Sequence, residues 1–233
     1  MTGPRNGASD GRPAQKGRFA IVVLVSGNGS NLQAIIDTLH RRVAGIEVAL
    51  VVSNVPGVFA LERARQAGIP TAVFPLEAFP NREERDLAIA AAVEAVQADL
   101  VVLAGYMHVL TPSFVARFPH RIINLHPALL PSFPGTHAIE DALRYGVKVT
   151  GVTVHFVDEG VDSGPVIQQQ AVTVMDGDTV DTLATRIHRV EHMLLPKVIE
   201  LIAQRQVIPP EPGSRWVRII GSSEVSRLRK VEQ

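Results

Sequence analysis

Hydrophobic residues occur along this chain in short continuous runs, and between these runs lie longer stretches with an apolar residue every three or four positions. The first run, FAIVVLV at 19–25, is rich in β-branched residues, which is typical of a strand buried on both faces of a sheet. In the next stretch, 30–42, Leu32, Ile35 and Leu39 have the spacing of one helix face. The pattern therefore predicts a strand, a glycine turn and a helix.

The same alternation recurs up to about residue 146. The later runs predict strands at 46–53, 71–74, 99–105 and 121–125, and helices at 58–67, 81–97 and 137–146. Strands that alternate with helices form βαβ units, in which the strands are parallel. We therefore predict an α/β protein with a doubly wound, mostly parallel open sheet.

After about residue 147 the apolar pattern becomes alternating. Segments 149–157 and 166–174 have polar residues at every second position over part of their length, which predicts strands at an edge of the sheet or antiparallel to it. A last long helix is expected at 179–204. No second set of core-forming runs follows it.

These observations predict one domain, at 19–204. Residues 1–18 are rich in Gly, Pro and small polar residues, and we expect them to form a disordered leader. Residues 205–233 contain Pro209, Pro210 and Pro212 ahead of RWVRII, which indicates a C-terminal surface arm that ends in a short strand.

Composition narrows the range of functions. The 233 residues include 23 Lys plus Arg, 23 Asp plus Glu and no Cys, and the formal net charge is zero. This balance argues against a partner held mainly through nucleic-acid phosphates, and the lack of Cys excludes thiol catalysis and Cys-ligated metals. No apolar run reaches the roughly 18 to 20 residues that span a bilayer, so we expect a cytoplasmic protein without membrane contact.

The first candidate site is SGNGSNL at 26–32, between the first strand and the first helix. Gly27 and Gly29 allow backbone N–H groups to approach a phosphate at the start of the helix. A dinucleotide site would place a third glycine where Leu32 stands and an acidic residue near Asn54, and neither is present. A glycine turn without a ligand remains the alternative.

The second candidate is INLHPALLPSFPG at 123–135. Asn124 and His126 are two positions apart at a strand end, so their side chains point to the same side. Pro127 and the prolines beyond it stiffen the loop that follows. These two side chains can converge on one substrate atom, although a structural hydrogen-bonding role for the histidine remains open.

An acidic loop after His155 contains Asp158, Glu159 and Asp162. If Asp162 folded back against His126, its carboxylate would favour the imidazolium and provide a general acid. A solvated connection or a loose cation site is the alternative for this loop.

A metal site is an alternative for HRVEH at 188–192, which contains two histidines four positions apart. His188 is not directly followed by the Glu that a zinc-protease helix carries. We therefore expect no metal ligands in this chain and regard His188 and His192 as two solvated residues on one helix face.

Five segments together resemble the phosphoribosylglycinamide formyltransferase family, the folate-dependent enzymes of purine biosynthesis. They are SGNGSNLQAII, LAGYMHVLTPSFV, INLHPALLPSFPGTHAIEDAL, GVTVHFVDEGVDSGPVI and RVEHMLLPKVI, in order between Phe19 and Gln204. The resemblance implies a Rossmann-like formyltransferase fold. It also implies transfer of the formyl group of 10-formyltetrahydrofolate, as co-substrate, to the amine of 5-phosphoribosylglycinamide, with small-molecule partners and no required metal.

The resemblance also implies roles for individual residues. The implied catalytic set is Asn124, His126 and Asp162. The residues implied for the phosphate and ribonucleotide are Gly29, Ser30, Asn31, His188 and Glu191. Those implied for folate are Arg82, Met107, His108, Val109, Leu110, Asn124, Asp158, Glu159, Gly160, Val161 and Asp162.

Two residues depart from the family pattern: His108 stands where relatives commonly have Arg, and Tyr106 where Phe is usual. Three other functions compete. A methionyl-tRNA formyltransferase would need a further tRNA-binding domain, a formyltetrahydrofolate deformylase usually has an N-terminal regulatory domain, and a non-catalytic binding protein would not need Asn124, His126 and Asp162 together. The sequence leaves a homodimer open.

Overall fold

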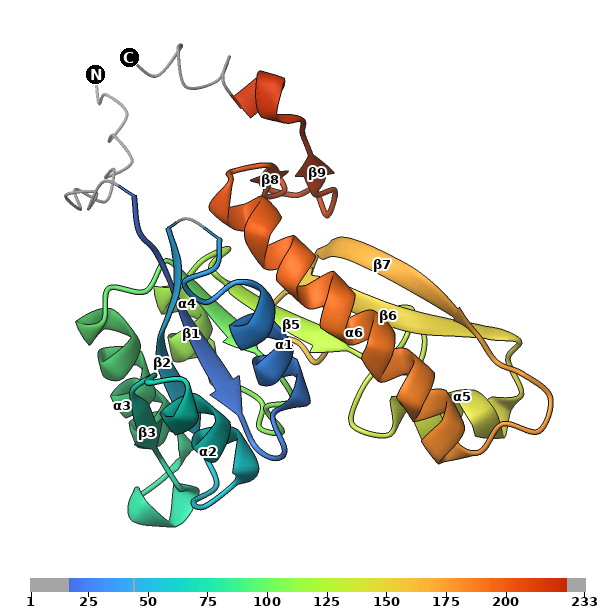
Figure 1. Ribbon diagram of the computed structural model, residues 1–233, viewed down its shortest axis with the longest axis horizontal. Helices are drawn as coiled ribbons and strands as arrows, with labels where there is room; N and C mark the ends of the chain where they lie inside the picture. The colour runs from blue at the N-terminus through green and yellow to red at the C-terminus, as the bar shows by residue number, and fades with distance from the viewer. Residues whose placement is uncertain (1–16, 44, 226–233) are drawn as a thin grey trace, which may run out of the picture.

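The computed structural model describes residues 17–43 and 45–225. The disordered leader expected at 1–18 therefore lies outside the described residues except for its last two positions, and so do the last eight residues of the expected arm. The polypeptide forms one large sheet with helices on both faces and a small two-stranded sheet near the C-terminus (Figure 1).

The large sheet has seven strands in the order β3-β2-β1-β4-β5-β6-β7. The strands are β1 (Phe19–Val25), β2 (Ile46–Ser53), β3 (Thr71–Val73), β4 (Leu100–Leu103), β5 (Ile122–His126), β6 (Val149–Phe156) and β7 (Val166–Thr173). The first five are parallel, whereas β6 is antiparallel to both β5 and β7. The predicted α/β class, with antiparallel strands at one edge, is confirmed.

Six helices were found in the described part of the chain. They are α1 (Ser30–Thr38), α2 (Phe59–Gln66), α3 (Arg82–Ala95), α4 (Pro112–Arg117), α5 (Ala138–Tyr145) and α6 (Val180–Ala203), with a 3-10 turn at Leu76–Ala78. Helix α1 ends four residues earlier than predicted, because Arg41 has a φ of 57°, outside the right-handed helical region. Helix α4 was missed because its six residues are too short to show a helical period.

The core is divided into two layers by the sheet. On β1, Ile21 and Val23 pack on the side that carries α1 and α6, and Val22 and Leu24 pack on the side that carries α3 and α4. All four side chains are fully buried. The continuous apolar run at 19–25 is therefore explained by helices on both faces of β1.

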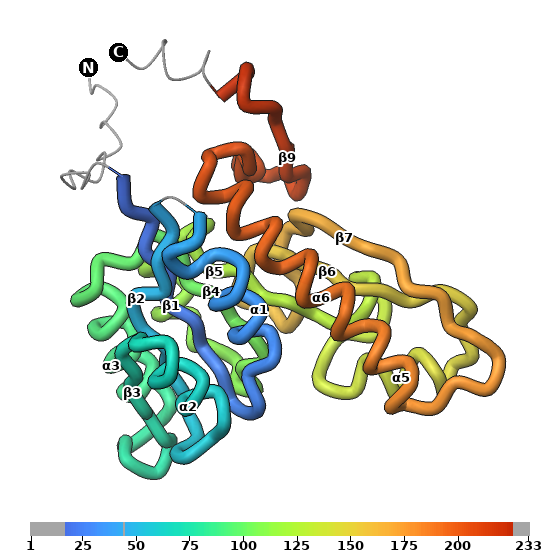
Figure 2. Tube along the Cα trace, viewed as in Figure 1, coloured from blue at the N-terminus to red at the C-terminus, as the bar shows by residue number. Residues whose placement is uncertain are grey.

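Helix α6 crosses one face of the sheet next to α1 (Figures 1 and 2). Its start is stabilised by a capping box, in which the Thr179 hydroxyl accepts from the Thr182 N–H and the Thr182 hydroxyl accepts from the Thr179 N–H. The predicted helix at 179–204 is confirmed, with Thr179 and Gln204 as its two caps.

Beyond α6, the chain forms two very short strands, β8 (Val207–Ile208) and β9 (Arg218–Ile219), which pair antiparallel. The predicted arm with one strand therefore contains a small hairpin. In Figure 2 this hairpin lies at the end of α6 that is remote from α5.

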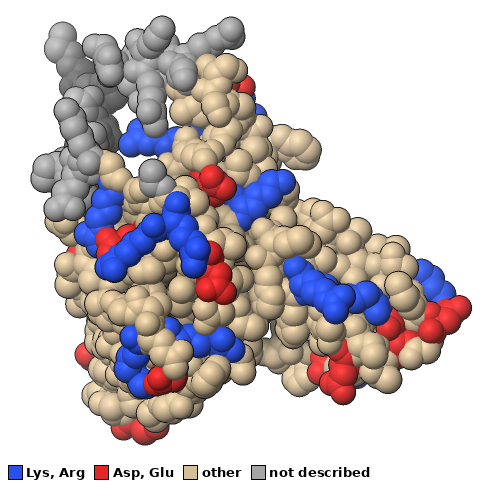
Figure 3. Space-filling view, viewed as in Figure 1, with Lys and Arg blue, Asp and Glu red and all other residues tan. Residues whose placement is uncertain are grey.

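Acidic and basic side chains lie close to one another on the face of the molecule shown in Figure 3. This distribution is in keeping with equal numbers of acidic and basic residues. Within residues 17–43 and 45–225, we find no helix that is long and apolar enough to cross a membrane.

Gly151 on β6 provides a test of the packing of the antiparallel edge. A Cβ at this position would overlap the Gln170 carbonyl oxygen on β7 and the Leu129 side chain. We expect Gly151→Ala to lower the free energy of unfolding by about 1 to 3 kcal/mol, because a backbone strand must shift. Urea unfolding of the purified variant measures this change.

Gly221→Ala is the matched control, since the nearest atom to its Cβ would lie 3.9 Å away. It should change the free energy of unfolding by no more than about 0.5 kcal/mol. Equal stability of the two variants would contradict the close approach of Leu129 and β7 to Gly151.

Candidate active site

The loops that follow β1, β4 and β5 meet at one edge of the sheet. These three strands are neighbours and parallel, so their carboxyl ends lie together. Ser26 joins two of the loops, because its N–H donates to the Gly105 carbonyl (3.1 Å) and its hydroxyl accepts from the Met107 N–H (2.9 Å). The same hydroxyl donates to Asn54 at the end of β2.

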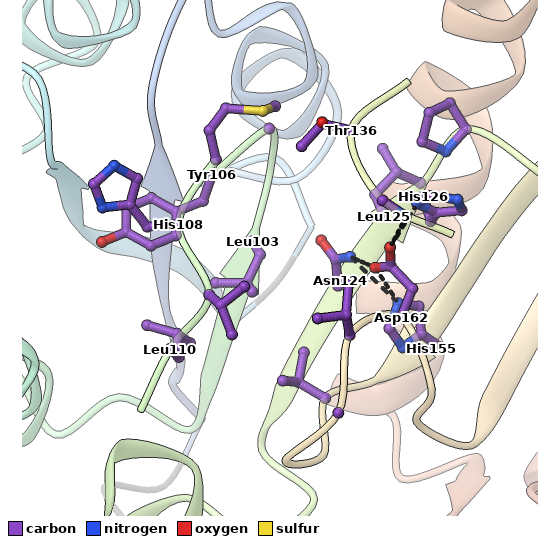
Figure 4. A pocket seen from close by; sticks show the side chains of 18 of the residues that line it. Leu103, Tyr106, His108, Leu110, Asn124, Leu125, His126, Thr136, His155 and Asp162 are labelled. Carbon is purple, nitrogen blue, oxygen red and sulfur yellow. Dashed lines mark hydrogen bonds and ion pairs between the residues drawn. The ribbon is translucent and has the colours of Figure 1, made fainter. Parts of the chain in front are cut away.

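A pocket opens at this edge, between the β4 loop on one side and the β5 and β6 segments on the other (Figure 4). Most of the residues expected to bind folate line it: Met107, His108, Val109, Leu110, Asn124, Asp158, Gly160, Val161 and Asp162. His126, His155 and Gly135 also contribute to its wall. Arg82 and Glu159 are exposed and do not line the pocket.

Asp162 is the centre of a hydrogen-bonded cluster in the pocket wall. Its Oδ1 accepts from Asn124 Nδ2 at 3.1 Å and lies 3.7 Å from His155 Nε2, and its Oδ2 lies 3.3 Å from His126 Nδ1. Oδ2 also accepts from the Gly135 N–H at 2.8 Å. The structure therefore brings together Asn124, His126 and Asp162, and adds His155 to them (Figure 4).

Asp162 reaches this position because the segment between β6 and β7 folds back over β5. Asp162 itself has a φ of 49°, in the left-handed region that Asp adopts more readily than most residues. Asp158 stabilises the turn, since its Oδ1 accepts from the Gly160 N–H and the Ser163 hydroxyl. Gly164 allows a close backbone approach, because a Cβ there would overlap the Phe156 carbonyl.

The surroundings of Asp162 favour its charged form. Burial by itself raises the pKa of this carboxyl, but the interactions with His155, the Gly135 N–H and the His126 ring outweigh burial and hold the pKa below its ordinary value. Both ring nitrogens of His126 face acceptors: Nδ1 faces Asp162, and Nε2 lies 2.8 Å from the Phe133 carbonyl oxygen. A protonated imidazole satisfies both acceptors at once.

A second polar cluster lies where α6 passes the start of α1. Asn31 Nδ2 donates to Glu191 Oε2 at 2.9 Å, and His188 Nδ1 lies 2.9 Å from the same oxygen. Glu191 is only 4% exposed. Its hydrogen bond with His188 raises the pKa of that histidine, against the opposing effect of burial.

The glycine turn leaves the start of α1 open to an anion. Gly29 is the N-cap residue, and no side chain caps the helix. Gly29 has a φ of 76°, and a Cβ added to it would lie only 2.6 Å from the Ala60 Cβ. Glycine is therefore required at this position. The backbone N–H groups of the first turn can therefore bind a phosphate.

The His188 and His192 rings stack on each other, with centroids 6.5 Å apart. We find no group of three or more His, Asp or Glu side chains arranged to hold a metal ion among the residues that the structure describes.

The formyl transferase family model matches residues 19–199. Phosphoribosylglycinamide formyltransferase of Escherichia coli is 45% identical over 183 residues, which are 78% of this chain and 86% of that protein. A crystal structure of glycinamide ribonucleotide transformylase 1 from Symbiobacterium toebii superimposes with a TM-score of 0.85 at 44% identity, covering 91% of this chain and all of that one. This chain belongs to the formyl transferase family.

Some relatives in the formyl transferase family are much longer. The trifunctional purine biosynthetic protein adenosine-3 of Drosophila melanogaster is 45% identical over 201 residues, and these cover 85% of this chain but only 15% of that protein. The chain thus corresponds to about one seventh of that relative. The β8–β9 hairpin lies beyond the last residue that the family model matches.

Several groups at this site were not predicted from the sequence. Phe133 and Gly135 act through backbone atoms, for which a sequence carries no signal. Arg85 and Asp86 are both fully buried beneath the β4 loop. They lie four and three positions before Ile89 on α3, and this helical spacing is the sequence signal that places them on the inward face of the helix.

Asp162→Asn tests the charged state of the cluster. The pKa of Asp162 is lower in the folded protein than in the unfolded chain. The charge of Asp162 therefore stabilises the fold at pH values above the ordinary aspartate pKa of about 3.9. This stabilisation is lost as the pH falls toward the pKa of the folded state. We expect the variant to be about 1 to 3 kcal/mol less stable than wild type at neutral pH. The difference should narrow below about pH 4.

Urea unfolding at several pH values measures this difference, and Asn at the position keeps the left-handed backbone accessible. Asp176→Asn is the control, since its side chain is 97% exposed in its pair with Lys148 and such pairs contribute little. A stability difference for Asp162→Asn that does not depend on pH would show that the carboxylate charge has no role.

Proposed function

We propose that this chain transfers the formyl group of 10-formyltetrahydrofolate to the amine of 5-phosphoribosylglycinamide, a step of purine biosynthesis. The observation that carries the proposal is the convergence of Asn124, His126 and Asp162 in the wall of a pocket. The relatives from E. coli and Mycobacterium tuberculosis, both named phosphoribosylglycinamide formyltransferase, support it at 45% and 46% identity.

In this proposal the formyl donor occupies the pocket between the two walls of Figure 4. Its pterin contacts the backbone of Met107–Leu110 and of the segment at 158–162, including Glu159. Arg82, exposed at the start of α3, meets the carboxylate-bearing end of the donor.

The phosphorylated substrate binds at the second cluster. The backbone at Gly29, Ser30 and Asn31 holds its phosphate, because α1 begins there without a side-chain cap. Glu191 and His188, which already bond to each other, hold the ribose and glycinamide part.

The reaction begins when the neutral amine attacks the formyl carbon. A new C–N bond forms, and the carbonyl oxygen becomes an oxyanion. Asn124 Nδ2–H and the His126 imidazolium donate to this oxyanion, while Asp162 keeps His126 charged and oriented. The bond from the formyl carbon to N10 of the folate then breaks, the amine loses a proton and N10 gains one.

This mechanism requires a local rearrangement. His126 Nε2 is bonded to the Phe133 carbonyl, so the proline-rich loop that carries this carbonyl must shift before Nε2–H can donate to substrate. We further propose that the enzyme acts in the cytoplasm on small molecules and requires no metal ion. Sedimentation velocity of the purified protein tests for a homodimer.

Consumption of 10-formyltetrahydrofolate by the purified protein, with and without 5-phosphoribosylglycinamide and with no added metal, tests the proposal. We expect consumption only when the ribonucleotide is present, with formation of its formylated product. Equal consumption without it would identify a formyl-folate hydrolase instead, and binding without consumption would identify a non-catalytic protein.

Substitution of the cluster tests the assigned roles. We expect His126→Ala and Asn124→Ala each to lower kcat by roughly 10² to 10⁴-fold, because each removes a donor to the oxyanion. His120→Asn is the control, since His120 is an exposed histidine outside the pocket and Asn tolerates its left-handed φ of 55°. Circular dichroism should show the fold unchanged in all three, and near-normal turnover in either cluster variant would remove that residue from the mechanism.

A further inference from the structure

Arg85 is fully buried on α3, directly beneath the β4 loop that lines the pocket. Its Nε and one terminal nitrogen both donate to Asp86 Oδ1, at 2.9 and 2.7 Å. Its other terminal nitrogen lies 2.5 Å from Nδ1 of His108. The proposed chemistry uses none of these contacts, yet burial of a charge is costly unless each group has a partner.

The contact with Arg85 determines which nitrogen of His108 carries the proton. A guanidinium has only donors, so the Nδ1 that faces it must accept a hydrogen bond and cannot carry a proton. His108 is then neutral, with its proton on Nε2. Burial and the positive charge of Arg85 accordingly lower the pKa of His108, with Arg82 adding to this and Asp86 opposing it.

The ion pair between Arg85 and Asp86 also holds the β4 loop at its C-terminal end. Asp86 Oδ2 accepts from the N–H of Thr111, which is buried, at 2.8 Å. The loop is also held at its beginning, where Met107 N–H donates to Ser26. Arg85 and Asp86 together therefore fix both the backbone at Thr111 and the ring of His108.

His108 lies at the end of the pocket that is remote from Asp162 in Figure 4, beside the ring of Tyr106. In the part of the chain that the structure describes, its Nε2 has no hydrogen-bond partner. The charged and titratable groups around it are Arg85, Asp86, Arg82 and Tyr106, and burial raises the pKa of Tyr106 to about 12, so this phenol is neutral. The positive charges of Arg82 and Arg85 and the unpaired Nε2–H of His108 therefore favour a ligand with an oxygen acceptor at this end of the pocket.

We propose that Arg85 is a positioning residue of the formyl-donor site, which holds His108 in its Nε2–H form so that this N–H donates to a carbonyl or carboxylate oxygen of the donor. This inference rests on the proposed function for the identity of the ligand. The state of the His108 ring does not depend on it, and the two can be tested separately.

Nitrogen-15 NMR of the imidazole rings in the free protein tests the ring state. His108→Gln assigns the signals by their loss. We expect Nδ1 of His108 to be unprotonated and Nε2 protonated from about pH 5.5 to 8, across the range in which a free histidine titrates. A protonated Nδ1, or titration near the ordinary pKa of about 6.5, would overturn the role of Arg85 whatever reaction the protein catalyses.

Removal of the Arg85 guanidinium should allow the His108 ring to bind a second proton. In Arg85→Gln the side-chain amide still donates to Asp86, but the positive charge beside His108 is lost, and we expect its signals to titrate within the same pH range. The variant leaves a buried carboxylate without its cation and can lose stability. The His108 variants below keep the proposal testable if it does not fold.

Kinetics test the hydrogen bond to the donor. Gln at 108 can accept from Arg85 and donate outward, whereas Leu can do neither. We expect His108→Gln to change the KM for 10-formyltetrahydrofolate by less than about threefold, and His108→Leu to raise it about tenfold, as for one lost hydrogen bond. The KM for the ribonucleotide and kcat should change little.

His120→Asn is the control, because His120 is an exposed histidine outside the pocket and Asn tolerates its left-handed φ of 55°; this variant should behave as wild type. An unchanged donor KM in His108→Leu, in an enzyme that transfers formyl groups, would overturn the proposed contact. If wild type transfers no formyl group, the proposed function fails and the donor contact fails with it, while the NMR result still decides the role of Arg85.

Discussion

The charge of Asp162 is the constraint on which the candidate site depends. A carboxylate that is almost buried is tolerated only if its oxygens are satisfied, and here the partners come from three parts of the chain: Asn124 and His126 on β5, His155 on β6 and the Gly135 N–H in the proline-rich loop. Asp162 therefore joins the strand, the loop and the returning segment in one wall of the pocket. The same contacts lower the pKa of Asp162 and place its carboxylate against the His126 ring, so the chemical and the structural roles of the carboxylate have one origin.

Buried charge is used in the same way at two other places around the sheet edge. Asp86 with Arg85 holds the β4 loop, and Glu191 with Asn31 holds α6 against the start of α1. Each carboxylate accepts hydrogen bonds from elements that are distant in the sequence. Because the loss of one partner would leave an uncompensated charge, these contacts favour one arrangement of the loops over others.

The parallel sheet explains why these groups meet at all. In neighbouring parallel strands the carboxyl ends lie at one edge, so the loops after β1, β4 and β5 are adjacent although about a hundred residues separate the first from the last. The antiparallel strands β6 and β7 contribute Asp162, which no loop of the parallel strands carries. The segment that connects β6 to β7 turns back over β5 and places Asp162 beside Asn124 and His126.

The sequence by itself determined the order and type of most elements, because apolar periodicity reports directly which side chains face a core. It also determined the glycine turn at Gly29 and the shared orientation of Asn124 and His126, since both follow from local backbone geometry. Tertiary structure alone decided the return of Asp162, the pairing of Asn31 with Glu191 across 160 positions and the burial of Arg85. Such contacts depend on how separate elements pack, and a pattern that extends over a few residues carries no information about a partner far along the chain.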